Sequence, residues 1–248
     1  MKRKVAALVA LILPSCRAKN LLLRMLGWKI GAKVRIGFSY VYSENINMKD
    51  CSSIGHANFI KLEGLFLDED AYIRNLNQIS GPLMVSLQKR AAIGNGNKIV
   101  RAINSVSWGK AVLKLGELSK ITSNHSIDCM RSVVFGDFST LAGYGSQIWT
   151  HGYVHKYKGA DRYRVDGSID IGNNVYIGSG SIINPGIKIA NSITVGSNSS
   201  VSKNLLKPGL YVNQSLRYLE FDYQKNIKKY PLIKVPSLTE KVVHKKHV

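Results

Sequence analysis

Two histidines in one irregular segment are the first candidates for chemistry. His151 and His155 lie in "WTHGYVH", inside residues 142–168, where the regular pattern of the neighbouring sequence stops. A neutral imidazole can accept or donate a proton near neutral pH, which suits it to general acid–base catalysis. Because catalytic side chains are often held on loops that a rigid scaffold projects, we expect the reactive group in this segment.

A third histidine, His125, stands close in sequence to Asn124 and Asp128. We expect His125 to orient a substrate or to support His151, with Asn124, Asp128 and His155 as further substrate-binding or supporting residues. A hydrogen-bonded histidine at a structural corner is the alternative for His125. Three imidazoles are also the number that a catalytic zinc ion commonly binds, so a zinc enzyme is a second hypothesis.

The scaffold that carries these residues has a six-residue repeat. Neither an α-helix, with 3.6 residues per turn, nor a strand, with a period of 2, explains such a spacing. The repeat is perfect in "IDIGNNVYIGSGSIINPGIKIANSITVGSNSSV", residues 169–201, and it breaks around Trp108 and again in residues 142–168. Its aliphatic or aromatic positions are Ile30, Ile36, Met48, Ile54, Ile60, Leu67, Ile73, Ile79, Leu87, Ile93, Ile99, Leu115, Ile121, Ile127, Phe135, Leu141, Ile171, Ile177, Ile183, Ile189, Val195 and Val201.

Six residues suit a very short strand followed by a turn. The aliphatic residue points inward, and Gly, Asn, Asp or Ser fills the corner, where it accepts backbone angles that β-branched residues resist. Three such units make one coil, and stacked coils bury ladders of aliphatic side chains worth about 1.5–3 kcal/mol each. The sequence therefore predicts an all-β solenoid whose two ends need caps.

These hexads resemble those of the hexapeptide-repeat acyltransferases. The stretch "IGNNVYIGSGSIINPGIKIANSITVGSNSSVSKN" is similar throughout to the C-terminal coils of bacterial sugar O-acetyltransferases, and the resemblance covers residues 30–217. It implies a left-handed parallel β-helix, acetyl-CoA as acyl donor, no metal, and a homotrimer with active sites between neighbouring rods. That family carries a catalytic histidine on an extended loop. The match to "WTHGYVH", with one extra residue between the histidines, implies that His151 is the general base.

The same resemblance implies the residues that contact the donor: Ser179, Ser197, Ser202, Lys203 and Arg217. A thin pantetheine arm could lie against the backbone at the small residues Ser179 and Ser197. Lys203 and Arg217 would meet the phosphates of the nucleotide end. Two departures from the family concern this end, because its "AGxPxR" turn appears here as "VNQSLR" and its Trp after "NNV" is Tyr176.

Composition narrows the classes of partner. The chain has 248 residues, and 35 Lys and Arg against 15 Asp and Glu give it a net charge of +20, which favours anionic partners. We expect no nucleic acid among them, because no nucleic-acid-binding module or patterned aromatic platform accompanies the charge. Cys16, Cys51 and Cys129 fit neither a disulfide framework nor a cysteine zinc site, which favours a reducing, cytoplasmic compartment.

The N-terminal residues are basic and amphipathic. In "RAKNLLLRML" the leucines have helical spacing and basic neighbours, so this helix could cap the rod or lie on an anionic membrane surface. The preceding apolar run from Val5 to Leu13 is too short to span a bilayer. Together with the basic residues before it and Cys16 after it, that run also resembles a short secretory or lipoprotein signal.

The sequence thus predicts three parts. Residues 1–27 form the N-terminal segment, residues 28–203 form a left-handed β-helix acyltransferase domain with a catalytic loop at 148–168, and residues 204–248 form a basic cap with an irregular or helical tail. The expected function is transfer of an acyl group, foremost acetyl, from coenzyme A to a sugar hydroxyl in bacterial surface polysaccharide (lipopolysaccharide or capsule) biosynthesis. The acceptor could be lipid-linked, and the enzyme could associate with the inner face of the cell membrane. A zinc enzyme like the γ-carbonic anhydrases and a non-catalytic binding solenoid are the alternatives.

Overall fold

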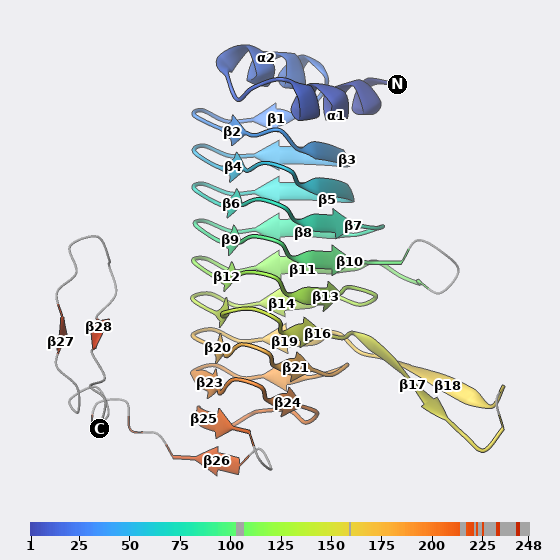
Figure 1. Ribbon diagram of the computed structural model, residues 1–248, viewed down its shortest axis with the longest axis vertical. Helices are drawn as coiled ribbons and strands as arrows, with labels where there is room; N and C mark the ends of the chain where they lie inside the picture. Colours follow the sequence, from blue (N-terminus) through green and yellow to red (C-terminus); the bar gives the residue numbers. More distant parts are fainter. Residues whose placement is uncertain are drawn as a thin grey trace.

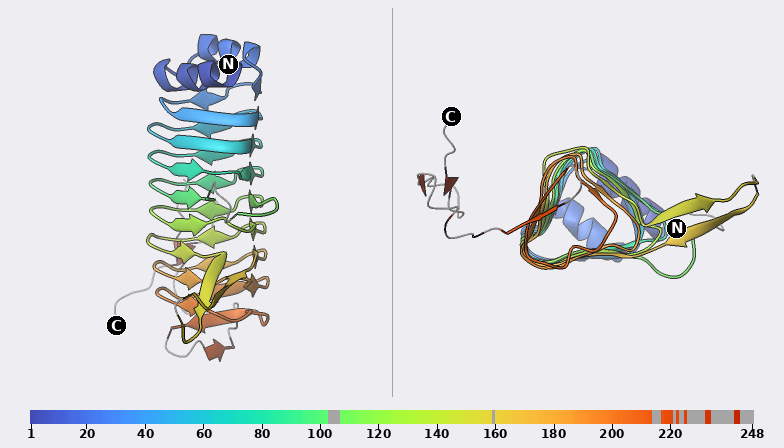
Figure 2. Two further views of the ribbon diagram at one scale, coloured as in Figure 1. Left: turned by 90° about the vertical axis from the view of Figure 1, so that its right-hand side faces the viewer. Right: turned by 90° about the horizontal axis from the view of Figure 1, so that it is seen from below.

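The computed structural model describes residues 1–102, 107–158, 160–213 and 217–220, with residues 222, 225, 232–233 and 242–243. Within them the chain forms a parallel β-solenoid that is triangular in cross-section when seen along its axis (Figure 2). The coils stack as a straight rod, and two helices cover the end at which the N-terminus lies (Figure 1). The left-handed parallel β-helix that the repeat and its resemblance predict is confirmed.

The first face of the triangle is one ten-stranded sheet. In order along the rod it contains β2 (Arg35–Ile36), β4 (Ser53–Ile54), β6 (Tyr72–Ile73), β9 (Ala92–Ile93), β12 (Lys120–Ile121), β15 (Thr140–Leu141), β20 (Tyr176–Ile177), β23 (Ile193–Val195), β25 (Gly209–Val212) and β26 (Arg217–Leu219). Neighbouring strands are parallel except for the last pair, β25 and β26, which closes the far end as an antiparallel hairpin.

The other two faces belong to one sheet because β3 (Tyr40–Met48) and β5 (Phe59–Leu67) run on around the corner between them. The second face contains β1 (Lys29–Ile30), β8 (Met84–Leu87), β11 (Val112–Leu115), β14 (Val133–Phe135), β19 (Ile169–Ile171) and β22 (Lys188–Ile189). The third face contains β7 (Gln78–Ser80), β10 (Lys98–Val100), β13 (Ser126–Asp128), β16 (Gln147–Ile148), β21 (Ile182–Ile183) and β24 (Ser200–Val201). Two antiparallel pairs lie outside the faces, β17 (His151–His155) with β18 (Arg162–Asp166), and β27 (Leu232–Ile233) with β28 (Val242–Val243).

The register of the strands explains the six-residue repeat. Every repeat position named from the sequence is buried, and equivalent positions pair from coil to coil in three ladders. The ladder of the third face, for example, runs through Val41, Ile60, Ile79, Ile99, Ile127, Ile148, Ile183 and Val201. Ile148 follows Leu141 by seven residues instead of six, which is why the repeat alone did not find it.

Residues at the corners take up the strain of the turns. Twelve described residues other than glycine have a positive φ, among them Asn124, Asn174 and Asn198, and none of the twelve is a β-branched Val, Ile or Thr. A branched Cβ would crowd the backbone in this left-handed conformation, so its exclusion follows from sterics. The prediction of Gly, Asn, Asp or Ser at the corners holds for five of these twelve residues, and Lys, Cys, Ala, Leu, Arg or Phe stands at the other seven.

The cap consists of α1 (Lys2–Ile12) and α2 (Arg17–Met25), which lie against the first coil. The sequence predicted α2, whereas α1 forms over the apolar run for which no structure was predicted. Among the described residues, no helix has the length and apolar character that crossing a membrane requires.

Candidate active site

The regular coils are interrupted at the corner between the third and second faces. After β16 the chain leaves the rod, forms the antiparallel hairpin β17–β18, and returns to begin β19. This hairpin projects far from the rod, as Figures 1 and 2 show. The segment that the sequence predicted as a projecting loop is therefore ordered into two strands, with His151 paired opposite Asp166 at the base.

His151 turns toward the adjacent coil and meets Asp128, the last residue of β13. Its Nδ1 lies 2.9 Å from Oδ2 of Asp128. The same carboxylate oxygen accepts hydrogen bonds from the backbone N–H of Thr150, at 3.0 Å, and from its hydroxyl, at 2.6 Å. Because an ionised carboxylate only accepts, Nδ1 of His151 carries the proton. Nε2, on the other side of the ring, is then the nitrogen that can accept a proton from a substrate.

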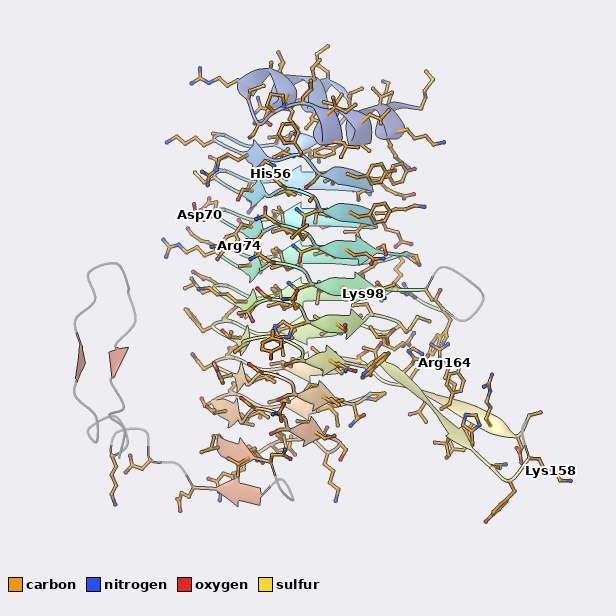
Figure 3. The ribbon with its side chains drawn as sticks, viewed as in Figure 1. His56, Asp70, Arg74, Lys98, Lys158 and Arg164 are labelled. Carbon is orange, nitrogen blue, oxygen red and sulfur yellow. The ribbon has the colours of Figure 1, made fainter. Side chains whose placement is uncertain are left out.

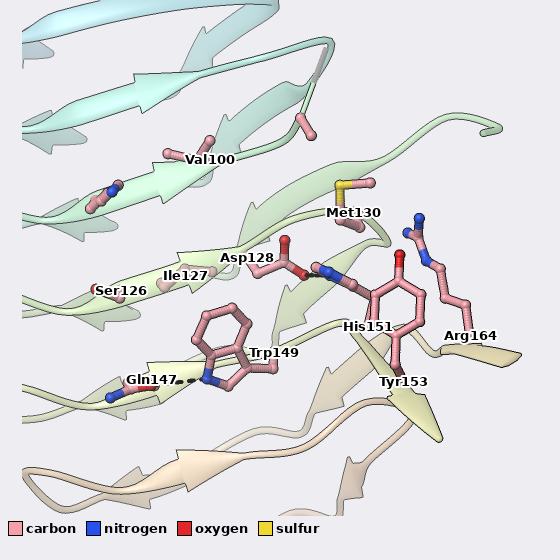
Figure 4. A pocket seen from close by; sticks show the side chains of 12 residues that line it. Val100, Ser126, Ile127, Asp128, Met130, Gln147, Trp149, His151, Tyr153 and Arg164 are labelled. Atoms are coloured by element: carbon pink, nitrogen blue, oxygen red, sulfur yellow. Dashed lines mark hydrogen bonds and ion pairs between the residues drawn. The ribbon is translucent and has the colours of Figure 1, made fainter. Parts of the chain in front are cut away.

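The two side chains lie beside a pocket of about 410 Å³ on the outer side of the third face (Figure 4). Strands β10, β13 and β16 supply one wall through Lys98 and Gln147 among others. The hairpin supplies the other through Tyr153 and Arg164, which Figure 4 shows beside His151. The pocket thus combines a basic nitrogen, cationic groups and aromatic surface, the mixture that a polar small molecule needs.

The base of the hairpin is fastened to the rod by contacts that no sequence pattern predicts. Trp108 donates a hydrogen bond from its indole Nε1 to Oδ2 of Asp166, at 2.8 Å, and Asp166 also accepts from Nε of Arg164. The guanidinium of Arg131 stacks 3.5 Å from the centroid of the Trp108 ring. Since Asp166 pairs with His151 across the hairpin, these contacts hold the histidine in place.

His125 occupies a different environment. It is buried in a stack of polar side chains at another corner of the rod, and it does not line the pocket. Its Nδ1 accepts a hydrogen bond from the backbone N–H of Ser146, so Nε2 carries the proton and faces the hydroxyl of Thr122, 3.0 Å away. Burial lowers the pKa of His125 to about 4. His125 is thus the corner histidine of the alternative interpretation, and its supporting role in catalysis stays a prediction.

The other two supporting candidates also lie apart from the dyad. Asn124 is an exposed turn residue with a φ of 55°. His155 is exposed at the outer end of β17, opposite Arg162. The structure therefore brings together only Asp128 and His151 from the predicted set. His125, His151 and His155 do not form a zinc site, and across the described residues no group of three His, Cys, Asp or Glu side chains is arranged to hold a metal ion.

The expected donor residues lie around the last coils of the rod at two corners. Ser179 and Ser197 follow β20 and β23 in successive coils, and the backbone N–H of Asn198 donates to the carbonyl of Ser179 at 2.7 Å. Ser202 and Lys203 follow β24 and line a hollow of about 530 Å³ with Tyr211. Arg217 is part of β26, but its side chain is outside the described part of the structure.

Ser202 and Lys203 share a corner with the hairpin that carries His151. Gly167, at the base of the hairpin, packs on Gly186 so closely that a Cβ on Gly167 would lie 2.3 Å from the Gly186 nitrogen. One coil further on, the backbone N–H of Lys188 donates to the side chain of Asn204, which adjoins Lys203. The catalytic candidate and two donor candidates are therefore stacked along one edge of the rod.

Some residues of the site were missed from the sequence. Thr150 and Trp149 directly precede His151 in the sequence. Their place in the site could be predicted only by knowing that Asp128 of the neighbouring coil lies opposite them. Trp108, Arg131 and Arg164 reach the site through long-range contacts for which the sequence contains no repeat or motif.

Comparison with known proteins gives matches at the level of structure only. No family model and no curated protein sequence matches the chain. A hexapeptide-repeat acetyltransferase of Vibrio cholerae, solved with acetyl coenzyme A, is 18% identical with a TM-score of 0.45, over 57% of this chain and 70% of its own. The polySia-specific acetyltransferase NeuO is 14% identical with a TM-score of 0.40, over 68% and 86%. AntD, an N-acyltransferase of Bacillus cereus solved with dTDP-4-amino-4,6-dideoxyglucose and coenzyme A, is 14% identical with a TM-score of 0.41, over 87% and 95%. At these values the case for a function has to come from the residues of this chain.

Proposed function

We propose that this protein transfers an acyl group, foremost acetyl, from a coenzyme A thioester to a hydroxyl group of a sugar. The observation that carries the proposal is the 2.9 Å contact between Nδ1 of His151 and the carboxylate of Asp128 beside a pocket. A carboxylate that fixes the tautomer of an imidazole, with the second nitrogen available to a substrate, is the arrangement of a general base.

The chemistry needs no covalent enzyme intermediate. Nε2 of His151 takes the proton of the sugar hydroxyl as its oxygen attacks the thioester carbonyl. Collapse of the tetrahedral intermediate breaks the C–S bond, and the coenzyme A thiolate leaves with the proton that His151 returns. Asp128 stabilises the imidazolium that exists between these two steps. General-base assistance of this kind typically contributes about 10²–10⁴ in rate.

The pocket supports a sugar as acceptor. The indole of Trp149 is 41% exposed at the pocket, and its Nε1 donates to the side-chain oxygen of Gln147 at 3.0 Å. An indole offers an apolar face to the C–H groups of a pyranose ring, while Gln147 and Lys98 can bind its hydroxyls. A hydroxyl held over Trp149 would lie on the same side of the hairpin as His151.

The donor would lie along the edge that joins His151 to the last coils. Lys203 would meet a phosphate there as a point charge, with Ser202 as a hydrogen-bonding partner. We also retain Ser179, Ser197 and Arg217 as proposed donor contacts. All residues of the mechanism except Arg217 belong to residues 28–203, which we propose as the catalytic domain between the terminal parts 1–27 and 204–248.

The hairpin supports a homotrimer. Val154, Tyr163 and Val165 are exposed on one side of it, opposite the side that carries Tyr153, and a two-stranded hairpin is at best marginally stable without a surface to pack on. We propose that these side chains pack against a neighbouring rod, which would complete the site between subunits. Sedimentation equilibrium tests this proposal, since a monomer at micromolar concentration would contradict it.

For the biological setting we propose surface polysaccharide biosynthesis in the bacterial cytoplasm, with an acceptor that is lipid-linked. The three cysteines are free, which suits a reducing compartment. Free acetyl-CoA and lipid-linked or nucleotide-linked sugars meet at the inner face of the cell membrane, where such an enzyme would work.

The test of function is an acceptor screen. Purified protein, acetyl-CoA and a panel of polysaccharide sugars are mixed, and release of the coenzyme A thiol is followed by a thiol reagent. Nuclear magnetic resonance of the product then separates an ester from an amide, and so O-transfer from N-transfer. If none of the sugars gave thiol release above the rate without protein, a non-catalytic solenoid would be favoured. Stoichiometric zinc that survives dialysis would instead favour the carbonic-anhydrase alternative.

A further inference from the structure

The two helices of the cap bury few side chains, and those that α1 buries are small. Both helices expose large apolar side chains. In α1 the side chains packed on the rod are three alanines, Ala6, Ala7 and Ala10, each fully buried. The opposite side of the helix carries Val5, Leu8 and Ile12, which are 42%, 51% and 65% exposed. At 100° per residue, these three positions lie about half a turn away from the alanines. An ordinary surface helix turns its larger apolar stripe toward the core. In α1 the larger apolar stripe faces outward instead.

The same arrangement recurs in α2. Leu23 is buried against the rod, while Leu21, Leu22 and Met25 are 58%, 42% and 72% exposed. Figures 1 and 3 show that both helices lie across the end of the rod with side chains directed away from the coils. The two stripes belong to one end of the molecule. We call them together the cap face, composed of Val5, Leu8, Ile12, Leu21, Leu22 and Met25.

The orientation of the cap face is fixed by a buried cation. The ammonium of Lys19 lies 2.7–2.9 Å from the carbonyl oxygens of Ala10, Leu13, Ile36 and Gly37. These contacts join both helices to the first coil. Burial lowers the pKa of Lys19 to about 8, so the side chain is still an ammonium at neutral pH and donates to these carbonyls. Lys19 holds α1 by the carbonyl groups at the C-terminal end of the helix. Rotation of α1 about its axis to bury its leucines would therefore break these hydrogen bonds.

Positive charge surrounds this apolar face. Residues 1–35 contain nine basic residues and no acidic one, and the first acidic residue in the chain is Glu44. The nine are Lys2, Arg3, Lys4, Arg17, Lys19, Arg24, Lys29, Lys33 and Arg35. Four of them, Arg17, Arg24, Lys33 and Arg35, line a hollow of about 740 Å³ between α2 and the first coil.

We propose that the cap face docks the rod end-on to an anionic lipid bilayer. Apolar stripes on helices too short to cross, bordered by Lys and Arg, are the signature of helices that lie in a membrane interface. Each basic residue near an anionic surface adds electrostatic attraction. A second copy of the chain is a poorer occupant, because head-to-head contact would bring the basic residues around two cap faces together. The proposal concerns binding alone and does not rest on the proposed reaction.

In end-on docking, an acceptor anchored in the bilayer has to reach along the rod to the His151 pocket. Along the third face, Ile148 stands five coils beyond Val41, through Ile60, Ile79, Ile99 and Ile127. At a strand spacing of about 4.8 Å, five coils hold the His151 pocket about 24 Å beyond the first coil. An acceptor anchored in the same bilayer would have to extend at least that far, which fits an oligosaccharide better than a single lipid-linked sugar.

Vesicle sedimentation tests the docking. The full-length protein is centrifuged with vesicles of phosphatidylcholine alone, or of phosphatidylcholine with phosphatidylglycerol, at low and high salt. We expect binding to the anionic vesicles that weakens with salt. The double variant Leu8→Ser with Ile12→Ser should weaken it by about tenfold or more, because two exposed aliphatic side chains no longer enter the interface. Arg17→Gln should weaken it at low salt by a few-fold.

Matched controls separate the cap face from the general charge of the chain. Leu206→Ser removes a leucine that is 62% exposed near the other end of the rod, and Lys158→Gln removes a charge at the far tip of the hairpin (Figure 3). Neither should change binding. Absence of binding at low salt, or equal binding by the double variant and by Leu206→Ser, would overturn the proposal. So would self-association, in sedimentation velocity without lipid, that the double variant abolishes, because the cap face would then join two copies.

Discussion

The substitution Asp128→Asn removes the negative charge of the proposed dyad and keeps the shape of the side chain. Oδ2 of Asp128 accepts from Nδ1 of His151 at 2.9 Å and from Thr150 at 3.0 and 2.6 Å. An amide oxygen in Asp128→Asn can accept the same three hydrogen bonds, so the tautomer and position of the ring are retained. The negative charge that stabilises the imidazolium is lost.

The expected cost follows from the strength of a charged hydrogen bond. Such a bond contributes about 1.5–3 kcal/mol and a neutral one about 0.5–1.5 kcal/mol, and each 1.4 kcal/mol is a factor of ten in rate. Losing the charge while keeping the bond should therefore cost about 1–1.5 kcal/mol and lower kcat by about 5- to 12-fold, with little change in KM for acetyl-CoA, because Asp128 stabilises a charge present only during reaction. Thiol release from acetyl-CoA with the sugar found in the acceptor screen gives both constants. Asp70→Asn is the matched control, since it removes the same charge from an exposed turn far from the pocket (Figure 3).

A double-mutant cycle tests whether Asp128 acts through His151. If Asp128 acts through the histidine, Asp128→Asn should have almost no further effect in a His151→Ala background. An equal loss of kcat in both backgrounds would refute the dyad, because Asp128 would then act on the substrate or on the fold. A large rise in KM with unchanged kcat would refute it as well.

Three further predictions concern the scaffold. His125 is neutral and buried, with a pKa lowered from 6.5 to about 4, so its contribution to stability is complete above pH 6.5 and is lost as the pH falls toward 4. In His125→Asn, the free energy of unfolding should fall less between pH 6.5 and 4, by up to about 3 kcal/mol. Urea unfolding at several pH values measures this, and an unchanged pH dependence would contradict a neutral, buried His125. Lys19→Met removes the ammonium that donates to four carbonyl oxygens, of which that of Ala10 keeps the backbone N–H of Ser39 at 3.4 Å. The substitution should cost about 2–4 kcal/mol in thermal unfolding, whereas Lys158→Met should cost almost nothing. Trp108→Phe loses the hydrogen bond to Asp166 and should lower kcat by a few-fold with an unchanged melting temperature; full activity would show that this anchor does not position His151.

Much of the fold could be predicted because one physical constraint repeats. Each coil must bury an aliphatic residue on each face, so a period of six appears wherever the coil is regular, from Ile30 to Val201. Where the coil departs from six residues, the period fails, as between Leu141 and Ile148. The helix α1 was missed for a different reason, since its apolar residues face outward and its packing surface is made of alanines.

The candidate site was only partly predictable. The break in the repeat indicates where a segment leaves the rod, and so it located His151. It says nothing of which residue of the next coil lies opposite, so Asp128 appeared only as one of several neighbours of His125. The sequence does not decide the role of His125, because a buried corner histidine and a supporting catalytic histidine have the same sequence context. Contacts such as that between Trp108 and Asp166 join loops from different coils, and no local pattern encodes them.

The proposed reaction depends on His151 as the general base, and the substitution His151→Ala removes that base. The substitution removes the group that takes the proton from the acceptor. Because the His151 side chain is 26% exposed, the rod should still fold normally, as circular dichroism can check. We predict a fall in kcat of about 10²–10⁴, with the calorimetric Kd for coenzyme A unchanged. A variant that is folded and transfers the acyl group at the rate of the unchanged protein would contradict the account.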